Sequence, residues 1–254
     1  MARNWHPPFW LVLKDKKKGN SNYKDRISLM EAFIKTFGKE RVLYVLGDRE
    51  FIGKEWVDWL NEQGIGYDLR IKENGQYISC ARGGMVKAAR LFQDLHPGEY
   101  RSLGLRRIGK TNGYKALVCG FKTNTGEIVV LIHSACVCEP WDKYRLRWQI
   151  ECLFRALKTG GFDLEATHIT RTERLDTLVG VLAVALCVAY RVGGLVVSIK
   201  KPKLRNNGYK PYSIIRYGID CLIELIRNPF ITVKKEVTKV VKFIFKHIFL
   251  CNIN

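Results

Sequence analysis

The chain has 254 residues, 47% of them hydrophobic and 26% charged, which excludes a disordered or fibrous protein and allows a substantial core. Lys and Arg number 43 against 24 Asp and Glu, so the formal net charge is +19. An excess of this size indicates a polyanionic partner, which could be nucleic acid or an anionic membrane surface. The end of the chain is especially basic, since residues 191–254 carry 13 Lys and Arg against 3 acids.

Neither the cysteines nor the apolar segments point to secretion or to a membrane. The eight Cys include no C-x2-C pair, and no secretory signal is recognised at the start, so we expect an intracellular, reduced protein. Leu178–Tyr190 is a run of thirteen apolar or small residues. A bilayer span needs roughly 20. We therefore expect a buried core helix that ends at Gly193–Gly194, and no membrane partner.

The first part of the chain alternates strand and helix signals. The turn at Gly19–Asn22 offers N-caps for a helix that Gly38 is suited to end, and Gly64 ends a second helix. This order predicts an α/β layer with a mainly parallel sheet. The expected elements are a strand at Phe9–Leu13, a helix with apolar residues from Ile27 to Phe37, a strand at Val42–Leu46, a helix at Lys54–Gln63 and a strand at Tyr67–Ile71.

From Gln76 to about Ala135 the pattern changes to short strands separated by glycine-containing turns. Leu117–Phe121 and Ile128–Ile132 are expected to be antiparallel partners. The stretch predicts an inserted antiparallel β subdomain. The expected division is 1–75 for a partial core, 76–138 for the β subdomain, 139–195 for the rest of the core and 196–254 for a basic C-terminal region.

Tyr144, Arg147, Glu151 and Lys158 are spaced by 3, 4 and 7 residues, within the predicted helix Trp141–Thr159. At about 100° per residue they fall on an arc of about 60°, on one side of that helix. The Glu can hold a divalent ion, while the Tyr, Arg and Lys can bond phosphate oxygens. A separate arc is expected to form a buried stripe, made of Leu146, Ile150, Leu153, Phe154 and Leu157.

Two further positions bear on this chemistry. Asp48 lies at the carboxyl end of the predicted strand Val42–Leu46, where open α/β sheets place ligand-binding groups. Its neighbour Arg49 is either a phosphate ligand or half of a surface ion pair. Trp148 lies about 40° from the arc. It could stack on a base, although packing against the β subdomain is the favoured interpretation.

These motifs resemble those of a known family. The segment YRLRWQIECLFRALK resembles the Y-x2-R-x3-E-x6-K signature of insertion-sequence DDE transposases, the class that includes the insertion-sequence-four family. The segment VLGDREFIGKEW resembles the sequence around the second catalytic Asp of that family. The resemblance extends from about Pro8 to Arg191, which is most of the chain.

The resemblance implies an RNase H-like catalytic core and DNA transposition, by metal-dependent cleavage and strand transfer. Asp48 and Glu151 would be catalytic metal ligands for two Mg²⁺ or Mn²⁺ ions, and Tyr144, Arg147 and Lys158, with Arg49 as a weaker candidate, would bind phosphates. The implied partners are double-stranded DNA at transposon ends and a second copy or a full-length transposase. The implied location is the cytoplasm, in association with the nucleoid.

The resemblance also implies a departure from the family pattern, because the first catalytic Asp of the family lies upstream of the matching segments. We expect an N-terminally truncated, catalytically incomplete copy that lacks the first core strands. Asp15 is the nearby acid that could substitute. A non-catalytic DNA-binding or inhibitory fragment is the alternative function, and a basic membrane-associated protein is a third.

Overall fold

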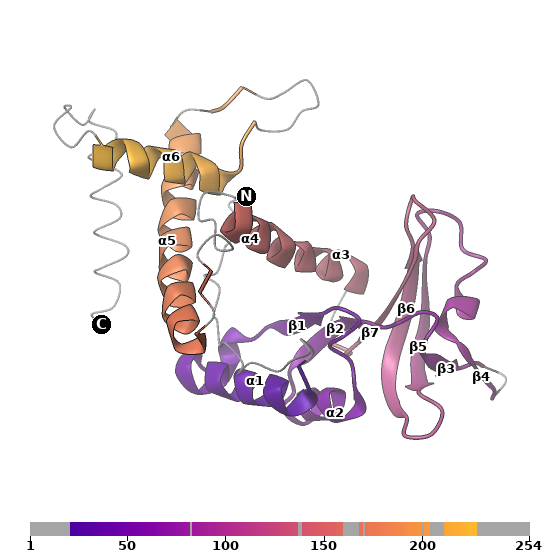
Figure 1. Cartoon of the computed structure of the whole chain (residues 1–254). Helices are drawn as coiled ribbons and strands as arrows, with labels where there is room; N and C mark the ends of the chain where they lie inside the picture. The colour runs from indigo at the N-terminus through magenta and orange to yellow at the C-terminus, as the bar shows by residue number, and fades with distance from the viewer. Residues whose placement is uncertain are drawn as a thin grey trace. The chain divides into compact units, whose positions relative to one another are not determined.

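The computed structural model describes residues 21–81, 83–136, 139–159, 168–169, 171–199, 201–203 and 211–227. These residues fall into two compact units that divide between Ile150 and Glu151. Figure 1 shows their helices and strands. The predicted strand at Phe9–Leu13 and the candidate ligand Asp15 lie outside the described residues.

The first unit contains a sheet with the strand order β1-β2-β7-β6-β5-β3-β4. Strands β1 and β2 are parallel, as expected for the first part of the chain, and the other described strand pairs are antiparallel. Short turns join β5 to β6 and β6 to β7, and short turns can only join antiparallel neighbours. The strands are β1 (Tyr44–Gly47), β2 (Gly66–Arg70), β3 (Tyr77–Ser79), β4 (Met85–Lys87), β5 (Tyr100–Ile108), β6 (Tyr114–Lys122) and β7 (Ile128–His133).

The strands expected in a β subdomain continue this same sheet, because β7 pairs with β2 through Asp68, Leu69 and Arg70. The predicted antiparallel pairing of β6 with β7 is confirmed. The described architecture is therefore mixed α/β.

Two helices of this unit follow the predicted signals. Helix α1 (Tyr23–Phe37) begins at a capping box in which Asn22 and Asp25 each accept a hydrogen bond from the other's backbone N–H. Gly38 ends it with a φ of 88°, which glycine adopts without strain. Helix α2 (Lys54–Glu62) is followed by Gly64 at a φ of 62°. Short 3₁₀ turns lie at η1 (Lys39–Arg41) and η2 (Ala88–Leu91).

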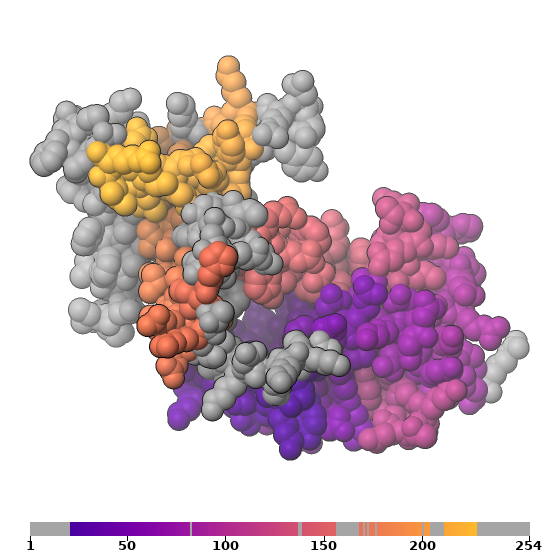
Figure 2. All heavy atoms as spheres, viewed as in Figure 1, coloured from indigo at the N-terminus to yellow at the C-terminus, as the bar shows by residue number. Residues whose placement is uncertain are grey.

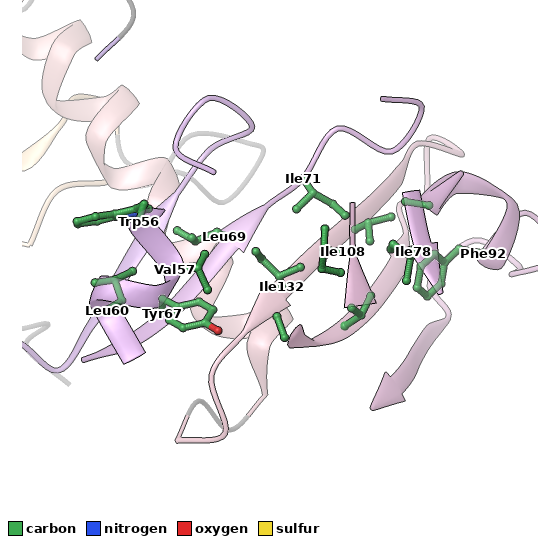
Figure 3. Packing of buried hydrophobic residues seen from close by; sticks show 14 of the residues in the cluster. Trp56, Val57, Leu60, Tyr67, Leu69, Ile71, Ile78, Phe92, Ile108 and Ile132 are labelled. Atoms are coloured by element: carbon green, nitrogen blue, oxygen red, sulfur yellow. The ribbon is translucent and has the colours of Figure 1, made fainter. Parts of the chain in front are cut away.

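The hydrophobic core of the unit lies on one face of the sheet, where α2 packs (Figure 3). A smaller apolar cluster covers the other face. In that cluster the short helix α3 (Pro140–Tyr144) places Tyr144 against Leu131, and Trp141 stacks on Phe121 with ring centroids 4.0 Å apart. The central core is made of Trp56, Val57, Leu60, Tyr67, Leu69, Ile71, Ile78, Phe92, Ile108 and Ile132.

The segment expected to be one helix is interrupted. Helix α3 passes into a 3₁₀ turn, η3 (Arg145–Arg147), before α4 (Trp148–Thr159) begins. A 3₁₀ turn has 3.0 residues per turn, so it changes the phase assumed for one continuous α-helix. The buried stripe is not observed, because Leu146, Ile150 and Phe154 are 38%, 47% and 44% exposed. The side chains of Leu157 and Lys158 lie outside the described residues.

In the second unit, helices α5 (Thr172–Ile199) and α6 (Ile214–Arg227) cross at two glycines. A Cβ at Gly193 would lie 1.8 Å from the Ile214 carbonyl oxygen, and one at Gly218 would lie 1.7 Å from the Ala189 carbonyl oxygen. The prediction that a helix ends at Gly193–Gly194 is therefore wrong. Gly193 instead allows the backbones of α5 and α6 to pack closely.

Helix α5 is longer and more exposed than the expected buried core helix. Within the described part of the chain, its residues Glu173–Ile199 are long and apolar enough to cross a membrane, with a mean hydropathy of 2.1. Val181 and Val184 are 61% and 63% exposed, whereas Leu186 and Val192 are fully buried. A single helix of this kind is weak evidence for a membrane span, because core helices of globular proteins meet the same criterion.

Candidate active site

Asp48 follows β1 directly, at the strand end that the sequence predicted. A turn holds it there, in which the Phe51 amide donates to the Asp48 carbonyl oxygen at 2.8 Å. The preceding Gly47 is needed, because a Cβ would lie 2.7 Å from the Leu69 side chain. The Asp48 side chain is 41% exposed, so the carboxylate is fixed in position and accessible from solvent.

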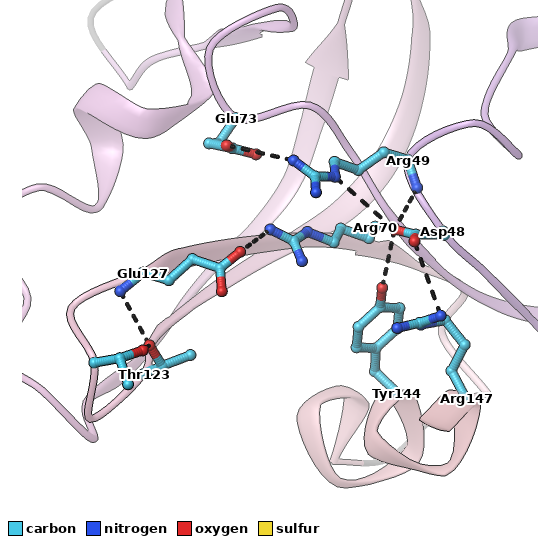
Figure 4. A network of polar contacts seen from close by, with 9 residues as sticks. Asp48, Arg49, Arg70, Glu73, Thr123, Glu127, Tyr144 and Arg147 are labelled. Carbon is cyan, nitrogen blue, oxygen red and sulfur yellow. Dashed lines mark hydrogen bonds and ion pairs between the residues drawn. The ribbon is translucent and has the colours of Figure 1, made fainter. Parts of the chain in front are cut away.

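Two signature residues contact this carboxylate (Figure 4). The Tyr144 hydroxyl donates to Asp48 Oδ1 at 3.5 Å, and Arg147 Nη1 lies 3.8 Å from Oδ2. Burial raises the pKa of Tyr144 to about 12, so the hydroxyl keeps its proton at neutral pH. The Arg147 guanidinium also lies 5.5 Å from the centroid of the Tyr144 ring. The structure thus brings together three of the predicted site residues.

Arg49 lies at the edge of the same group. Its Nε is 4.0 Å from Asp48 Oδ1, and its Nη1 is 3.9 Å from Glu73 Oε1. These distances match the ion-pair interpretation of Arg49. The Arg49 side chain remains 45% exposed, which leaves it accessible to a phosphate as well.

Arg70 is a site residue that the sequence reasoning missed. It projects from β2, its side chain is only 11% exposed, and it pairs with Glu127. Electrostatic coupling links it to Tyr144. The signal was present, because a cation in a strand whose five residues are all buried needs a partner or a function.

Asp68 and His133 are a second pair that the sequence did not reveal. They are direct cross-strand neighbours on β2 and β7, and both are buried. Among the described residues, neither Asp68 carboxyl oxygen nor His133 Nε2 has a hydrogen-bond partner. Burial raises the pKa of Asp68 to about 8, which favours the neutral acid, and lowers the pKa of His133.

The other two predicted residues lie in α4, Glu151 in its first turn and Lys158 near its end. Trp148, which starts α4, is 53% exposed, so it is not buried in a core. Within the described residues, no three His, Cys, Asp or Glu side chains are grouped closely enough to hold a metal ion. Asp48 offers hard oxygen ligands suited to Mg²⁺, and a complete site needs further carboxylates.

A strand-end carboxylate beside a tyrosine and several arginines is suited to binding phosphate oxygens and their metal ions. The family model described as transposase DDE domain matches residues 8–188, more than two thirds of the chain. The chain therefore belongs to the DDE transposase family. A search of curated proteins found no match. Family membership suggests transposition, a nuclease or transferase activity, a DNA substrate and divalent metal ions.

Proposed function

We propose that this chain is an insertion-sequence DDE transposase of the insertion-sequence-four type. It would cleave double-stranded DNA at transposon ends and transfer the strand from an RNase H-like core. The contact of Asp48 with Tyr144 and Arg147 carries the proposal. Both motifs that resemble the family meet in this contact, although they lie about a hundred residues apart in the chain.

Each predicted residue has a role in this reaction. Asp48 and Glu151 would ligate Mg²⁺ or Mn²⁺, which when bound activates the attacking oxygen and stabilises the leaving one. Tyr144 and Arg147 would bond the oxygens of the phosphate to be cut, and Lys158 and Arg49 would contact flanking phosphates. Trp148 is exposed enough to stack on a base.

The contacts at Asp48 support an exchange of partners when substrate binds. The distances of 3.5 Å from Tyr144 and 3.8 Å from Arg147 are longer than those of strong charge-assisted bonds, at about 2.7–2.9 Å. A phosphate would compete well for both donors. Their transfer from the carboxylate to the phosphate would leave Asp48 free for a cation, so DNA and metal would bind together.

Several finer points belong to the same proposal. The division into 1–75, 76–138, 139–195 and 196–254, action at the nucleoid, and pairing with a second copy or with a full-length transposase all follow from the family resemblance.

The test is cleavage of DNA that carries the cognate ends, with Mg²⁺ or Mn²⁺. Asp48→Asn and Glu151→Gln should each remove cleavage, because an amide keeps the shape but holds the metal poorly. Asp58→Asn is the matched control, since Asp58 forms a surface pair with Lys54 on α2. Lys158→Ala should be milder, because several residues share the phosphate contacts. Cleavage that survives both active-site changes would exclude this function. Specific end binding without cleavage would favour the non-catalytic fragment.

A further inference from the structure

The strands β3 to β6 have one face packed on the hydrophobic core and an opposite face that projects away from it. Ile78 of β3 and Ile108 of β5 are fully buried in the core and pair with each other. Successive side chains of a strand alternate between faces. Tyr77 and Arg107, the neighbours of this buried pair, therefore project from the opposite face. In Figure 2 this part of the unit, in purple and magenta, reaches the outer surface.

Cations gather on that opposite face. Arg107 pairs in register with Lys115 of β6, and Tyr77 pairs with Lys87 of β4. At the turn between β5 and β6, Lys110 Nζ lies 3.8 Å from the centroid of the Tyr77 ring. All four cations are exposed. We call Lys87, Arg107, Lys110 and Lys115 the basic face.

Acids do not neutralise the basic face. Residues 76–122 carry nine Lys and Arg but only two acids. One of these acids, Asp94, is bound by Arg101 at 2.7 Å, and the other, Glu99, accepts the His96 amide at 2.7 Å. Within the described residues, no ion pair involves any member of the basic face. Like charges directly opposite on neighbouring strands, as at Arg107 and Lys115, are destabilising. A polyanion would relieve that cost.

The turn that carries Lys110 is held in one conformation. The Arg107 guanidinium donates to the carbonyl oxygens of Lys110 at 3.4 Å and Thr111 at 3.2 Å. The Arg107 amide donates to Ser79 Oγ at 3.0 Å, and Gly109 turns the chain at a φ of 90°. A preformed site loses less conformational entropy when a ligand binds. The turn of the basic face is therefore arranged before any partner arrives.

We propose that the basic face binds the sugar–phosphate backbone of duplex DNA, away from the cleavage position at Asp48. The proposal rests on the proposed function and adds a second, sequence-independent contact to the same substrate. Neighbouring strands lie about 4.8 Å apart, so the sheet presents a closely spaced array of cations. Lys110 covers one side of the Tyr77 ring, which reduces the area open to the base stacking that single strands need.

The experiment compares full-length variants in binding a duplex of about 30 base pairs without transposon ends, over a salt series. Lys110→Glu with Lys115→Glu should weaken binding at least tenfold. It should also make the dependence of log K on log salt shallower by about 2, since each lost phosphate contact contributes about 0.9. The control, Lys24→Glu with Lys35→Glu on α1, makes the same charge change at two exposed lysines and should alter binding little. Arg107 is left intact because it braces the turn.

Thermal unfolding checks that both double variants fold. If the charge-reversal variant Lys110→Glu with Lys115→Glu does not fold, Lys110→Ala with Lys115→Ala is the milder substitute. Equal losses in the test and control variants would overturn the proposal, because net charge alone would then explain binding. So would unchanged DNA binding combined with lost binding to anionic lipid vesicles, which would assign the face to a membrane. A wild-type chain that binds no duplex at low salt would reject the proposed function as well. If the wild type binds duplex DNA and the test variant binds it equally well, only the proposed role of the basic face would be rejected.

Discussion

The Tyr144 hydroxyl donates to the carboxylate of Asp48 at 3.5 Å, across 96 residues of sequence. Tyr144 can do so because its ring packs with Leu131 and Val129 on the sheet face opposite the main core. The contact ties the segment after the sheet to the end of β1. It couples the packing of that small cluster to the orientation of the carboxylate.

Tyr144→Phe isolates the hydroxyl, because the ring that packs on the sheet is retained. In the proposed reaction this hydroxyl bonds the phosphate to be cut, and a hydrogen bond to a charged group contributes about 1.5–3 kcal/mol. We therefore expect cleavage of end-bearing DNA to fall roughly ten- to a hundredfold, with little change in melting temperature. Tyr23→Phe, at an exposed tyrosine of α1, is the control. Unchanged cleavage by Tyr144→Phe would show that the hydroxyl has no part in the reaction.

Asp68→Asn should change the pH dependence of stability. The pKa of Asp68 is about 8 in the folded chain, against an ordinary value of 3.8. Between these values the folded state keeps a proton that the unfolded state releases. Stability should therefore fall as pH rises from about 4 to about 8, by up to roughly 1.4 kcal/mol per pH unit. Denaturant titrations should show that the free energy of unfolding of the variant, relative to that of the wild type, increases as pH rises over this range.

Asp94→Asn is a control for which the pH dependence of stability should change in the opposite direction. Its hydrogen bond with Arg101 lowers the pKa of Asp94, so its contribution is present at neutral pH and is lost as pH falls. A wild-type chain whose stability, relative to Asp68→Asn, does not change between pH 5 and 8 would mean that the Asp68 carboxyl is not held neutral.

Gly193→Ala and Gly218→Ala should each destabilise the second unit. The added methyl groups would meet backbone carbonyl oxygens at 1.8 and 1.7 Å, so the helices must separate, at a cost of about 1–3 kcal/mol or more. Gly180→Ala and Gly194→Ala are matched controls in the same α5 helix. Apart from the helix's own backbone and the chain neighbours, the described residues place no atom within 4 Å of the new methyl. Those two should be neutral or stabilising by up to about 1 kcal/mol, because Ala favours helix. Urea titrations that rank all four alike would contradict the crossing of α5 and α6.

Local signals predicted local structure well. Asn22 and Gly38 delimited α1, and Gly64 marked the end of the α2 region, because caps depend on a few neighbouring residues. The same kind of local signal gave a wrong helix end at Gly193–Gly194 of α5. What decides the role of Gly193 is the approach of α6, some twenty residues further on, which no local pattern encodes.

The candidate site likewise combines features that local sequence predicts with features that depend on distant contacts. The motifs placed Asp48, Tyr144 and Arg147 in one function, and the structure brings these three together. It also adds Arg70, whose role depends on the pairing of β2 with β7. That pairing joins segments about sixty residues apart, so strand periodicity could not reveal it.

Asp48 and Glu151 are proposed to hold the same metal ions. Anomalous scattering from Mn²⁺ in crystals of the chain with end DNA tests this directly. We expect Mn²⁺ within coordination distance of both carboxylates. These then lie about 4–8 Å apart, compatible with metals roughly 3.5–4 Å from each other. The manganese signal should vanish in Asp48→Asn. Manganese bound at other residues, or the two carboxylates on opposite sides of the sheet, would show that Asp48 and Glu151 do not share a metal site.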